Sequence, residues 1–344
     1  MSLPTSTDLG AKAGWRIEDP VIRLREWGTD RIHRLPDTPV EWTLGSAAAC
    51  QLRLRDRSAQ ISRKHATLLP FAGGWKLLDQ DSKNGLWGDG VRRPELTLTP
   101  GVEIGIGGLC LIAESRQLIA LRALLCRFLG FDPDRQVSVD QALRSLREWA
   151  ALRVSLVLLG DGDLTTVAQQ LHAATLAEGA PFTTCSKQDS GLATLQATRH
   201  GTLWTPRLPQ DFAAVAASLC ESDNRTRLML HAQSAADAAR AAITLARPAI
   251  IALPSFTARH AELERILQES ADAAAAKLGP RARSITPRDL EQLVCLKYRG
   301  FAALEATVHR VVVLRTWGVS RGADRLRISH VALSRWARRR NLTT

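Results

Sequence analysis

The chain has 344 residues, of which 45% are hydrophobic and 23% charged, as is ordinary for a globular protein of two or three domains. No apolar run approaches the roughly 18 residues that span a bilayer, and the N-terminus lacks the hydrophobic region of a signal peptide, so we expect a cytoplasmic protein without a membrane anchor. The formal net charge of +12 predicts an acidic partner, of which nucleic acid is the commonest.

Residues 1–14 are expected to form a disordered tail. Residues 15–116 contain short alternating or apolar runs, such as "HATLLPF" and "GWKLLDQ", separated by Gly-Gly, Asp-Gly and Pro-Gly turn signals. Short strands at a spacing of roughly ten residues predict an all-β sandwich.

The pattern changes after this region. In residues 117–279, apolar runs of the buried-strand type, such as "RVSLVLLG", alternate with segments of helical periodicity, which predicts a parallel α/β sheet. Residues 280–316 and 317–344 are expected to be helical. The boundary with the α/β region lies at "GPRARSITP" (279–287), where a Thr-Pro pair starts a helix. The six cysteines are far apart and lack metal-site spacing, so we expect reduced core thiols, no metal and no cofactor.

Two polar clusters in the sandwich region raise a chemical question. Ser62-Arg63-Lys64-His65 and Ser82-Lys83-Asn84-Gly85 flank a run that is typical of paired strands. Catalysis is disfavoured because no G-x-S-x-G elbow is present, and because strand alternation would put Ser62 and His65 on opposite faces. Hydroxyl, amide and cationic groups on loops suit a phosphate with three acceptor oxygens, although Ser62 and Asn84 could also simply cap turns.

At this spacing, the two clusters together with Gly45, Trp75 and Asp79 resemble the forkhead-associated (FHA) domain, a β-sandwich that recognises phosphothreonine peptides. The resemblance implies that Ser62 binds the phosphate, His65 supports the loops and Asn84 grips the peptide backbone. It assigns phosphopeptide binding to Ser46, Ser62, Arg63, Lys83 and Asn84, and a structural role to Gly45, His65 and Gly85. The chain departs from the family at Ser46, which stands where an arginine usually contacts the phosphate; Arg57, Arg63 or Lys83 could compensate.

The segment "VLLGDGDLTTVAQQLH" (157–172) has the strand–glycine loop–helix order of a phosphate-binding loop, but no Lys occurs from 154 to 186. The region resembles the AAA+ domain of sigma-54-dependent transcription activators, with residues 280–316 as its helical lid. Leu164 stands where the phosphate-binding Lys would fall, Pro206 and Arg207 replace the Walker B acids, and Ala302 replaces the sensor Arg. The loop that grips sigma-54 has no match, so we expect a degenerate AAA+ domain without ATPase activity.

The C-terminal stretch "WGVSRGADRLRISHVALSRWARRRNL" predicts two short helices around a tight turn, with Ser329 as an N-cap. It resembles the Fis-type helix-turn-helix of the same activators, with Arg327 in place of the usual turn Gly. The resemblance implies DNA binding through Arg321, Ser329, His330, Val331, Ala332, Ser334, Arg335, Arg338, Arg339 and Arg340, and a homodimer. The alternative is a basic, solvated helix pair that merely ends the lid.

Together these patterns indicate a cytoplasmic bacterial signalling protein and no enzyme. We expect a phosphothreonine-responsive transcriptional regulator that binds a Ser/Thr-kinase product through its FHA domain and double-stranded DNA through its C-terminal helices. The alternative is an FHA phosphopeptide-binding adaptor without sequence-specific DNA binding. An active ATPase of the sigma-54 kind is a third class, disfavoured by the missing residues.

Overall fold

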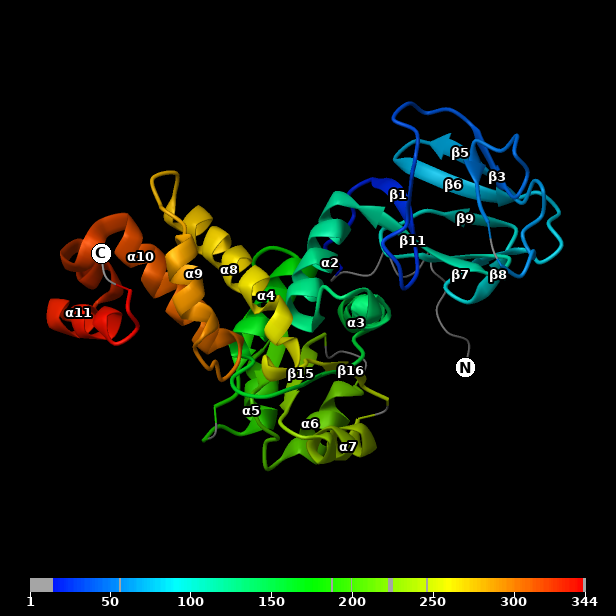
Figure 1. Cartoon of the computed structure of the whole chain (residues 1–344). Helices are drawn as coiled ribbons and strands as arrows, with labels where there is room; N and C mark the ends of the chain where they lie inside the picture. The colour runs from blue at the N-terminus through cyan, green and yellow to red at the C-terminus, as the bar shows by residue number, and fades with distance from the viewer. Residues whose placement is uncertain are drawn as a thin grey trace.

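The computed structural model describes residues 15–55, 57–186, 188–198, 200–221, 225–245 and 247–342. The tail expected at residues 1–14 lies outside this part of the chain. Three parts follow one another along the sequence: a β-sandwich, a parallel sheet with helices, and a helical C-terminal part. Figure 1 shows the sandwich and the C-terminal helix α11 at opposite ends of the molecule.

The predicted sandwich is confirmed. One sheet has the strand order β2-β1-β11-β10-β7-β8 and the other β4-β3-β5-β6-β9. The strands are β1 Val21–Glu26, β2 Ile32–Arg34, β3 Trp42–Gly45, β4 Leu52–Arg53, β5 Ala66–Phe71, β6 Gly74–Asp79, β7 Leu86–Gly88, β8 Val91–Arg93, β9 Glu95–Thr97, β10 Glu103–Ile106 and β11 Leu109–Ser115. Alternation places one face of each sheet in the core, as at Ile104 and Ile106, which are fully buried.

The parallel sheet has the strand order β13-β14-β15-β12-β16. Its elements are α2 Arg116–Leu129, η1 Pro133–Arg135, α3 Gln136–Leu152, β12 Leu156–Leu159, α4 Thr165–Thr175, β13 Phe182–Thr184, α5 Gly191–Ala197, β14 Thr202–Thr205, α6 Phe212–Leu219, β15 Arg227–Ala232, α7 Ala235–Thr244 and β16 Ala249–Ala252. Helices cover both faces, so β12 is a continuous apolar run and every residue of β15 is buried, including Arg227 and His231. The short edge strand β13 was not predicted, because it lacks such a run.

The C-terminal part consists of η2 Thr257–Glu262, α8 Leu263–Leu278, α9 Pro287–Val294, α10 Phe301–Leu326 and α11 His330–Arg338. The predicted Thr-Pro helix start is confirmed: the Thr286 hydroxyl accepts a hydrogen bond from the backbone N–H of Asp289, whose carboxylate in turn accepts one from the backbone N–H of Thr286. Gly318 has a left-handed φ of 71° and interrupts α10, which therefore continues as a separate short helix before α11.

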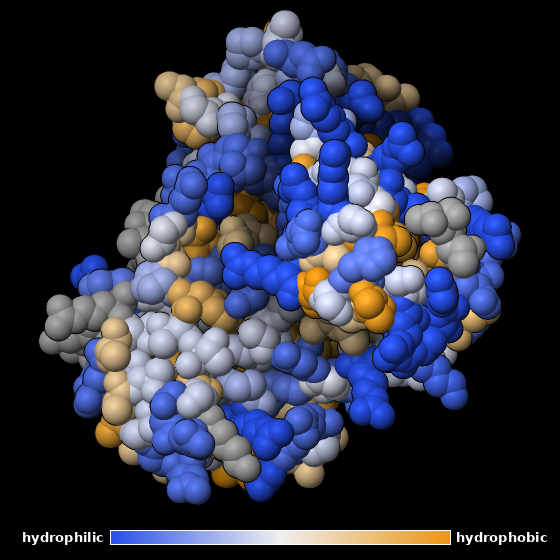
Figure 2. Space-filling view, turned by 90° about the vertical axis from the view of Figure 1, so that its left-hand side faces the viewer, coloured by the Kyte–Doolittle hydropathy of each residue, from blue (hydrophilic) through white to orange (hydrophobic). Residues whose placement is uncertain are grey.

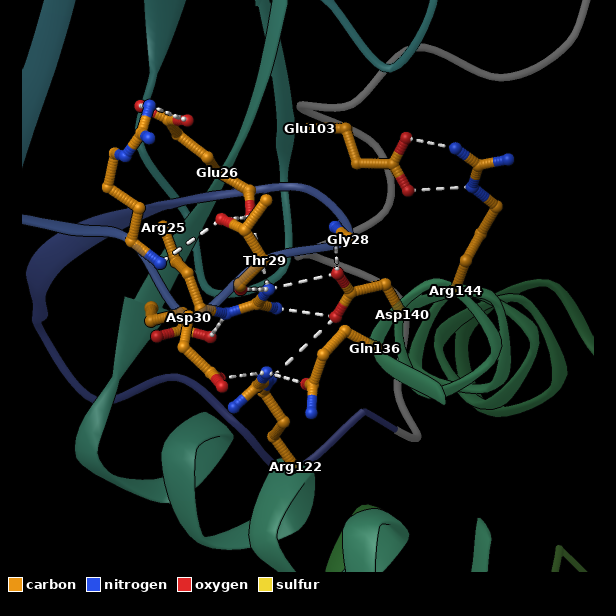
Figure 3. Close-up of polar contacts among 12 residues, drawn as sticks. Arg25, Glu26, Gly28, Thr29, Asp30, Glu103, Arg122, Gln136, Asp140 and Arg144 are labelled. Atoms are coloured by element: carbon orange, nitrogen blue, oxygen red, sulfur yellow. Dashed lines mark hydrogen bonds and ion pairs between the residues drawn. The ribbon is translucent and has the colours of Figure 1, made fainter. Parts of the chain in front are cut away.

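A buried ion network joins the sandwich to α2 and α3. The guanidinium of Arg25 donates to Asp140 at 2.9 and 2.5 Å and to Glu114 at 2.6 Å, and all three side chains are 0–1% exposed. The backbone N–H of Gly28 adds a third bond to Asp140 at 2.7 Å. Figure 3 shows the contacts of Asp140 with Arg25 and Gly28 beside the more exposed pair of Arg144 and Glu103. Charges withdrawn from water require such partners, so the network fixes the sandwich against the helices.

Two further findings concern expectations from the sequence. All six cysteines are free, but Cys220 and Cys295 are exposed, so the expectation of core thiols is wrong for these two. Cys295 lies at the C-terminal end of the amphipathic helix α9, where its side chain faces solvent.

Among the described residues, no helix is both long and apolar enough to cross a membrane.

Candidate functional site

Three loops at one end of the sandwich bring the two polar clusters together. They are the β3–β4 loop (residues 46–51), the β4–β5 loop (residues 54–65) and the β6–β7 loop (residues 80–85). The first two are joined by backbone hydrogen bonds from Ser46 N–H to Ser62 O at 3.0 Å and from Ala47 N–H to Arg63 O at 3.1 Å. The residues assigned to the site therefore come from three separate segments that the sheet registers bring side by side.

Gly45 is required by the close approach of these loops. A Cβ atom at this position would lie 2.2 Å from the carbonyl oxygen of Arg63, a distance that real Cβ contacts do not reach. The neighbouring Ser46 is half-buried, and its hydroxyl donates to Ile61 O at 3.0 Å. The predicted structural role of Gly45 thus has a direct steric cause.

His65 is fully buried and bridges two of the loops. Its Nδ1 accepts the backbone N–H of Ser62 at 3.2 Å, and its Nε2–H donates to the carbonyl oxygen of Gly85 at 3.1 Å. Both ring nitrogens are occupied, so the ring acts as a fixed spacer. The expectation that alternation separates Ser62 from His65 is wrong, because residues 62–65 form a turn before β5 begins.

Ser62 and Asn84 lie side by side at the rim of the site. The hydroxyl oxygen of Ser62 accepts the backbone N–H of Lys83 at 3.1 Å, and the side-chain amide of Asn84 donates to Gln60 O at 2.7 Å. Both side chains are half-buried. The Ser62 O–H and the Asn84 carbonyl oxygen have no bond among the described residues, so both polar groups retain capacity for a ligand.

The β6–β7 loop is held by its own side chains. Ser82 is buried; its hydroxyl donates to Asp79 at 2.5 Å and accepts the backbone N–H of Gly85 at 3.1 Å. Gly85 has a φ of 75°, which favours glycine. The indole N–H of Trp87 donates to Asn84 O at 3.0 Å. These bonds orient Lys83 and Asn84 outward.

Cations surround this rim. Arg53, Arg63, Lys64 and Lys83 are exposed, and none lies in an ion pair with a carboxylate of the described residues. Sequence reasoning missed Arg53, whose Nε donates to the carbonyl oxygen of Ser46 at 3.3 Å. Arg53 is brought to the rim by the parallel pairing of β3 with β4, which sets it opposite Gly45. Hydrophobic periodicity does not predict this pairing. The site is a cationic, hydroxyl-lined rim suited to an anion.

The comparisons with known proteins agree with this geometry. Residues 42–107 match the FHA domain family, so this part of the chain is an FHA domain. A comparison with curated proteins gives no match.

Solved structures are similar to this chain over about a quarter of its length. Mycobacterium tuberculosis EmbR, solved in complex with a low-affinity phosphopeptide, is 24% identical over 28% of this chain and 24% of its own, with a TM-score of 0.25. The FHA domain of FhaA, solved in complex with an intracellular domain, is 25% identical over 26% of this chain and 96% of its own (TM-score 0.24). An FHA domain from Chlamydia trachomatis is 22% identical over 27% of this chain and 95% of its own (TM-score 0.24).

The C-terminal residues predicted for DNA binding occupy a helix pair. The turn between α10 and α11 is made by Arg327 in a left-handed conformation (φ 52°, ψ 43°), and the Ser329 hydroxyl caps α11 by accepting Ala332 N–H at 3.1 Å. Most of the predicted residues are exposed, namely Arg321, Ser329, His330, Val331, Ala332, Arg335, Arg338 and Arg339, whereas Ser334 and Arg340 are half-buried. Figure 2 shows this side of the molecule, where hydrophilic residues surround smaller hydrophobic areas.

The opposite side of this helix pair is packed. Ala323, Leu333, Ala337 and Leu342 are at most 5% exposed and belong to the same core as α8 and the first part of α10. The guanidiniums of Arg310 and Arg340 lie over the Trp336 ring at 5.0 and 4.8 Å. The exposed basic face of α11 is therefore held on a fixed support.

The loop after β12, which has the order of a phosphate-binding loop, is filled by the chain itself. Asp163 accepts the backbone N–H of Thr165 at 2.8 Å, and hydrogen bonds from Thr165 lower the pKa of this carboxyl. A Cβ atom at Gly162 would lie 2.1 Å from the carbonyl oxygen of Arg299. The indole N–H of Trp204 donates to the Thr165 hydroxyl at 3.1 Å. A carboxylate thus stands at the start of α4, where a phosphate would otherwise approach.

Proposed function

We propose that the chain is a phosphothreonine-responsive, DNA-binding transcriptional regulator without ATPase activity. The observation that carries the proposal is the FHA domain in which Ser62 and Asn84 keep free hydrogen-bonding capacity while His65 holds their loops in place. The partner would be a protein bearing a phosphothreonine, the product of a Ser/Thr kinase.

Charge supports the phosphopeptide part of the proposal. A phosphothreonine carries close to two negative charges and three acceptor oxygens at neutral pH. The rim offers hydroxyl, amide and cationic donors and no described carboxylate in contact with its exposed cations. Each charge-assisted hydrogen bond contributes about 1.5–3 kcal/mol, so two or three of them suffice to discriminate a phosphorylated from an unphosphorylated peptide.

The C-terminal helix pair supports the DNA-binding part. Residues 281–344 contain fourteen Lys and Arg against four Asp and Glu, and the exposed face of α11 carries His330, Arg335 and the basic residues at its end. A helix with polar N-terminal residues and cations at its C-terminal end suits a major groove with phosphate contacts beside it. A Fis-type identity, a sigma-54-activator ancestry and a homodimer are parts of the same proposal.

The absence of ATPase activity is proposed from the loop after β12. It lacks a lysine, the Asp163 carboxylate accepts the backbone N–H of Thr165 at the start of α4, and Gly162 is packed against the backbone of Arg299. Transfer of a phosphoryl group needs cations to stabilise the charge that develops. We therefore expect no thermal shift of the protein with ATP and Mg²⁺; a saturable shift of several degrees would overturn this part.

The phosphopeptide part is tested with Ser62→Ala and Asn84→Ala in the full chain. Both variants should lose at least tenfold in affinity for phosphothreonine peptides, because Ser62→Ala removes a free donor and Asn84→Ala a free acceptor at the rim. Both should keep the DNA affinity of the unaltered chain. Fluorescence anisotropy with a phosphothreonine peptide library measures the first quantity and an electrophoretic shift the second. Unchanged phosphopeptide affinity in both variants would refute the site.

The DNA-binding part is tested by selecting genomic fragments on the full chain at physiological salt, beside a chain with Arg335→Ala. Substitution of an exposed residue is preferable to truncation, because Leu333 and Ala337 belong to the core. A shared sequence motif that is enriched only by the unaltered chain is the expected result. Weak binding without a motif, lost steeply with salt for all fragments, would instead favour a phosphopeptide-binding adaptor.

A further inference from the structure

The FHA rim has a gap in its positive charge at Ser46. Gly45 can carry no side chain because of the Arg63 carbonyl oxygen, and the short Ser46 hydroxyl already donates to Ile61 O at 3.0 Å. Neither residue offers a cation at the place where the β3–β4 loop meets Ser62. A phosphate bound beside Ser62 would need a cation reaching this place from elsewhere.

Arg53 reaches this place from the neighbouring strand. It lies opposite Gly45 in the parallel pair of β3 and β4, and it points outward because Leu52 and Leu54 on either side are buried. Its Nε donates to the carbonyl oxygen of Ser46 at 3.3 Å, and the backbone N–H of Ser46 in turn donates to Ser62 O at 3.0 Å. The guanidinium is thus connected to the Ser62 turn through one residue.

The other exposed cations of the rim are not placed in this way. Arg63 and Lys83 contribute backbone groups to the loops, namely the Arg63 carbonyl oxygen and the Lys83 N–H. Their side chains form no hydrogen bond or ion pair among the described residues, and the same holds for Lys64 and Arg57. Arg53 is, within the described part of the chain, the rim cation whose side chain is fixed against the β3–β4 loop.

We propose that Arg53 makes the principal cationic contact with the phosphate of the bound phosphothreonine, in place of an arginine at position 46. The proposal rests on the proposed phosphopeptide function. A guanidinium has five N–H donors in a fixed fork; with Nε on Ser46 O, the two terminal nitrogens are the part that can form paired bonds to phosphate oxygens. The contact with Ser46 holds the side chain in position before the peptide binds.

The test measures the affinity of the full chain for peptides with a fixed central phosphothreonine and random flanks, beside the same peptides with threonine. Arg53→Ala should lower the affinity for the phosphorylated peptides about 10- to 100-fold and leave the weak affinity for the threonine peptides unchanged. Arg53→Lys should lie between the two, because it keeps the charge and loses the fork. Arg55→Ala is the matched control, since it removes the same charge from an exposed position two residues further along the chain, in the β4–β5 loop.

The outcomes separate this inference from the proposed function. If the unaltered chain does not prefer phosphorylated peptides, both are overturned. If it does, and Arg53→Ala binds as well as Arg55→Ala, only the assignment of Arg53 is overturned. A loss of phosphopeptide affinity in Lys83→Ala but not in Arg53→Ala would assign the contact to Lys83 and would also overturn the assignment of Arg53. Because Arg53 is exposed, the variants should keep the thermal midpoint of the unaltered chain, which verifies that they are folded.

Discussion

The FHA domain and the parallel sheet that follows it each contain a loop whose sequence suggests phosphate binding, and the two loops differ in what folding leaves free. In the FHA rim, the buried residues Gly45 and His65 hold the loops, so that the half-buried Ser62 and Asn84 keep hydrogen-bonding capacity. In the loop after β12, polar groups bond to one another. A motif therefore predicts binding only if a separate set of residues supports the loop.

The two parts are also packed differently against the rest of the chain. The rim lies at the end of the sandwich away from α2, whereas the loop after β12 lies against Arg299 and Gly300 at the start of α10. The loop after β12 is therefore covered by the beginning of the C-terminal helical part.

The largest expected effect concerns the ion network between the two parts. Asp140→Ala leaves the buried guanidinium of Arg25 with Glu114 as its one carboxylate partner among the described residues, beside the carbonyl oxygens of Glu26 and Thr29. The substitution should lower the free energy of unfolding by about 3–5 kcal/mol, because breaking a buried ion pair by removing one partner is costly. Urea unfolding measures this. Lys76→Ala, which breaks the exposed pair with Glu95, is the control and should change it by less than about 1 kcal/mol.

A decrease of less than about 1 kcal/mol in the free energy of unfolding for Asp140→Ala would contradict the role given to this ion network. It would mean that Glu114, water and the carbonyl oxygens of Glu26 and Thr29 satisfy Arg25 once Asp140 is removed. The sandwich would then be held to the helices mainly by apolar contacts such as those of Ile112 and Leu118.

The second prediction addresses the filled loop. Gly162→Ala introduces a Cβ atom 2.1 Å from Arg299 O at a φ of 77°, whereas Gly179→Ala introduces one at a φ of 82° with no atom within 4 Å. The control variant should lose about 1 kcal/mol from its left-handed backbone alone. Gly162→Ala should lose at least about 1 kcal/mol more, measured by thermal or urea unfolding. Equal losses would show that the loop can move away from α10.

Much of the fold follows from the sequence, and the reasons differ between the parts. Strand alternation predicts the sandwich, and apolar runs predict β12, β14, β15 and β16. Both patterns are visible in the sequence because buried positions favour apolar residues. The edge strand β13 and the exposure of Cys220 and Cys295 depend on tertiary neighbours, which no local pattern contains.

The candidate site follows from the sequence only in part. The clusters at 62–65 and 82–85 indicate the rim, because their residue types and spacing are local. Arg53 lies beside the rim because β4 pairs with β3, which no local pattern predicts. The bridging bonds of His65 require a turn where the spacing suggested a strand. The closure of the loop after β12 likewise depends on residues 299 and 300, more than 130 positions away.

The third prediction uses the protonation of a histidine in the α/β part. Burial lowers the pKa of His172, and the nearby Arg227 acts in the same direction against the hydrogen bond to Ala180 O. The unfolded chain then binds the proton more readily, so the stability that His172 contributes is present above its ordinary pKa of about 6.5 and is lost as the pH falls through its lowered pKa in the folded chain.

The measurement compares unfolding of the unaltered chain and of His172→Gln between pH 5 and pH 8. The difference in stability between the two pH values should be smaller in the variant, by about 1 kcal/mol or less. His309, whose pKa is also lowered by burial, is present in both chains and cancels in the comparison. An equal pH dependence in the two chains would show that the His172 ring is hydrated in the folded state.

The smallest expected effect is at the turn of the C-terminal helix pair. Arg327 adopts the left-handed conformation that glycine adopts without strain. Arg327→Gly should therefore raise the free energy of unfolding by up to about 1 kcal/mol, with Arg327→Asn in between. The side chain of Arg327 is exposed and forms no hydrogen bond or ion pair among the described residues, so its removal should cost no stability. If it contacts a DNA phosphate, the stabilised variant should bind DNA more weakly, and the slope of log affinity against log salt should fall by about one. A variant that is more stable and binds DNA as before would remove Arg327 from the interface and leave the phosphate contacts to Arg338 and Arg339.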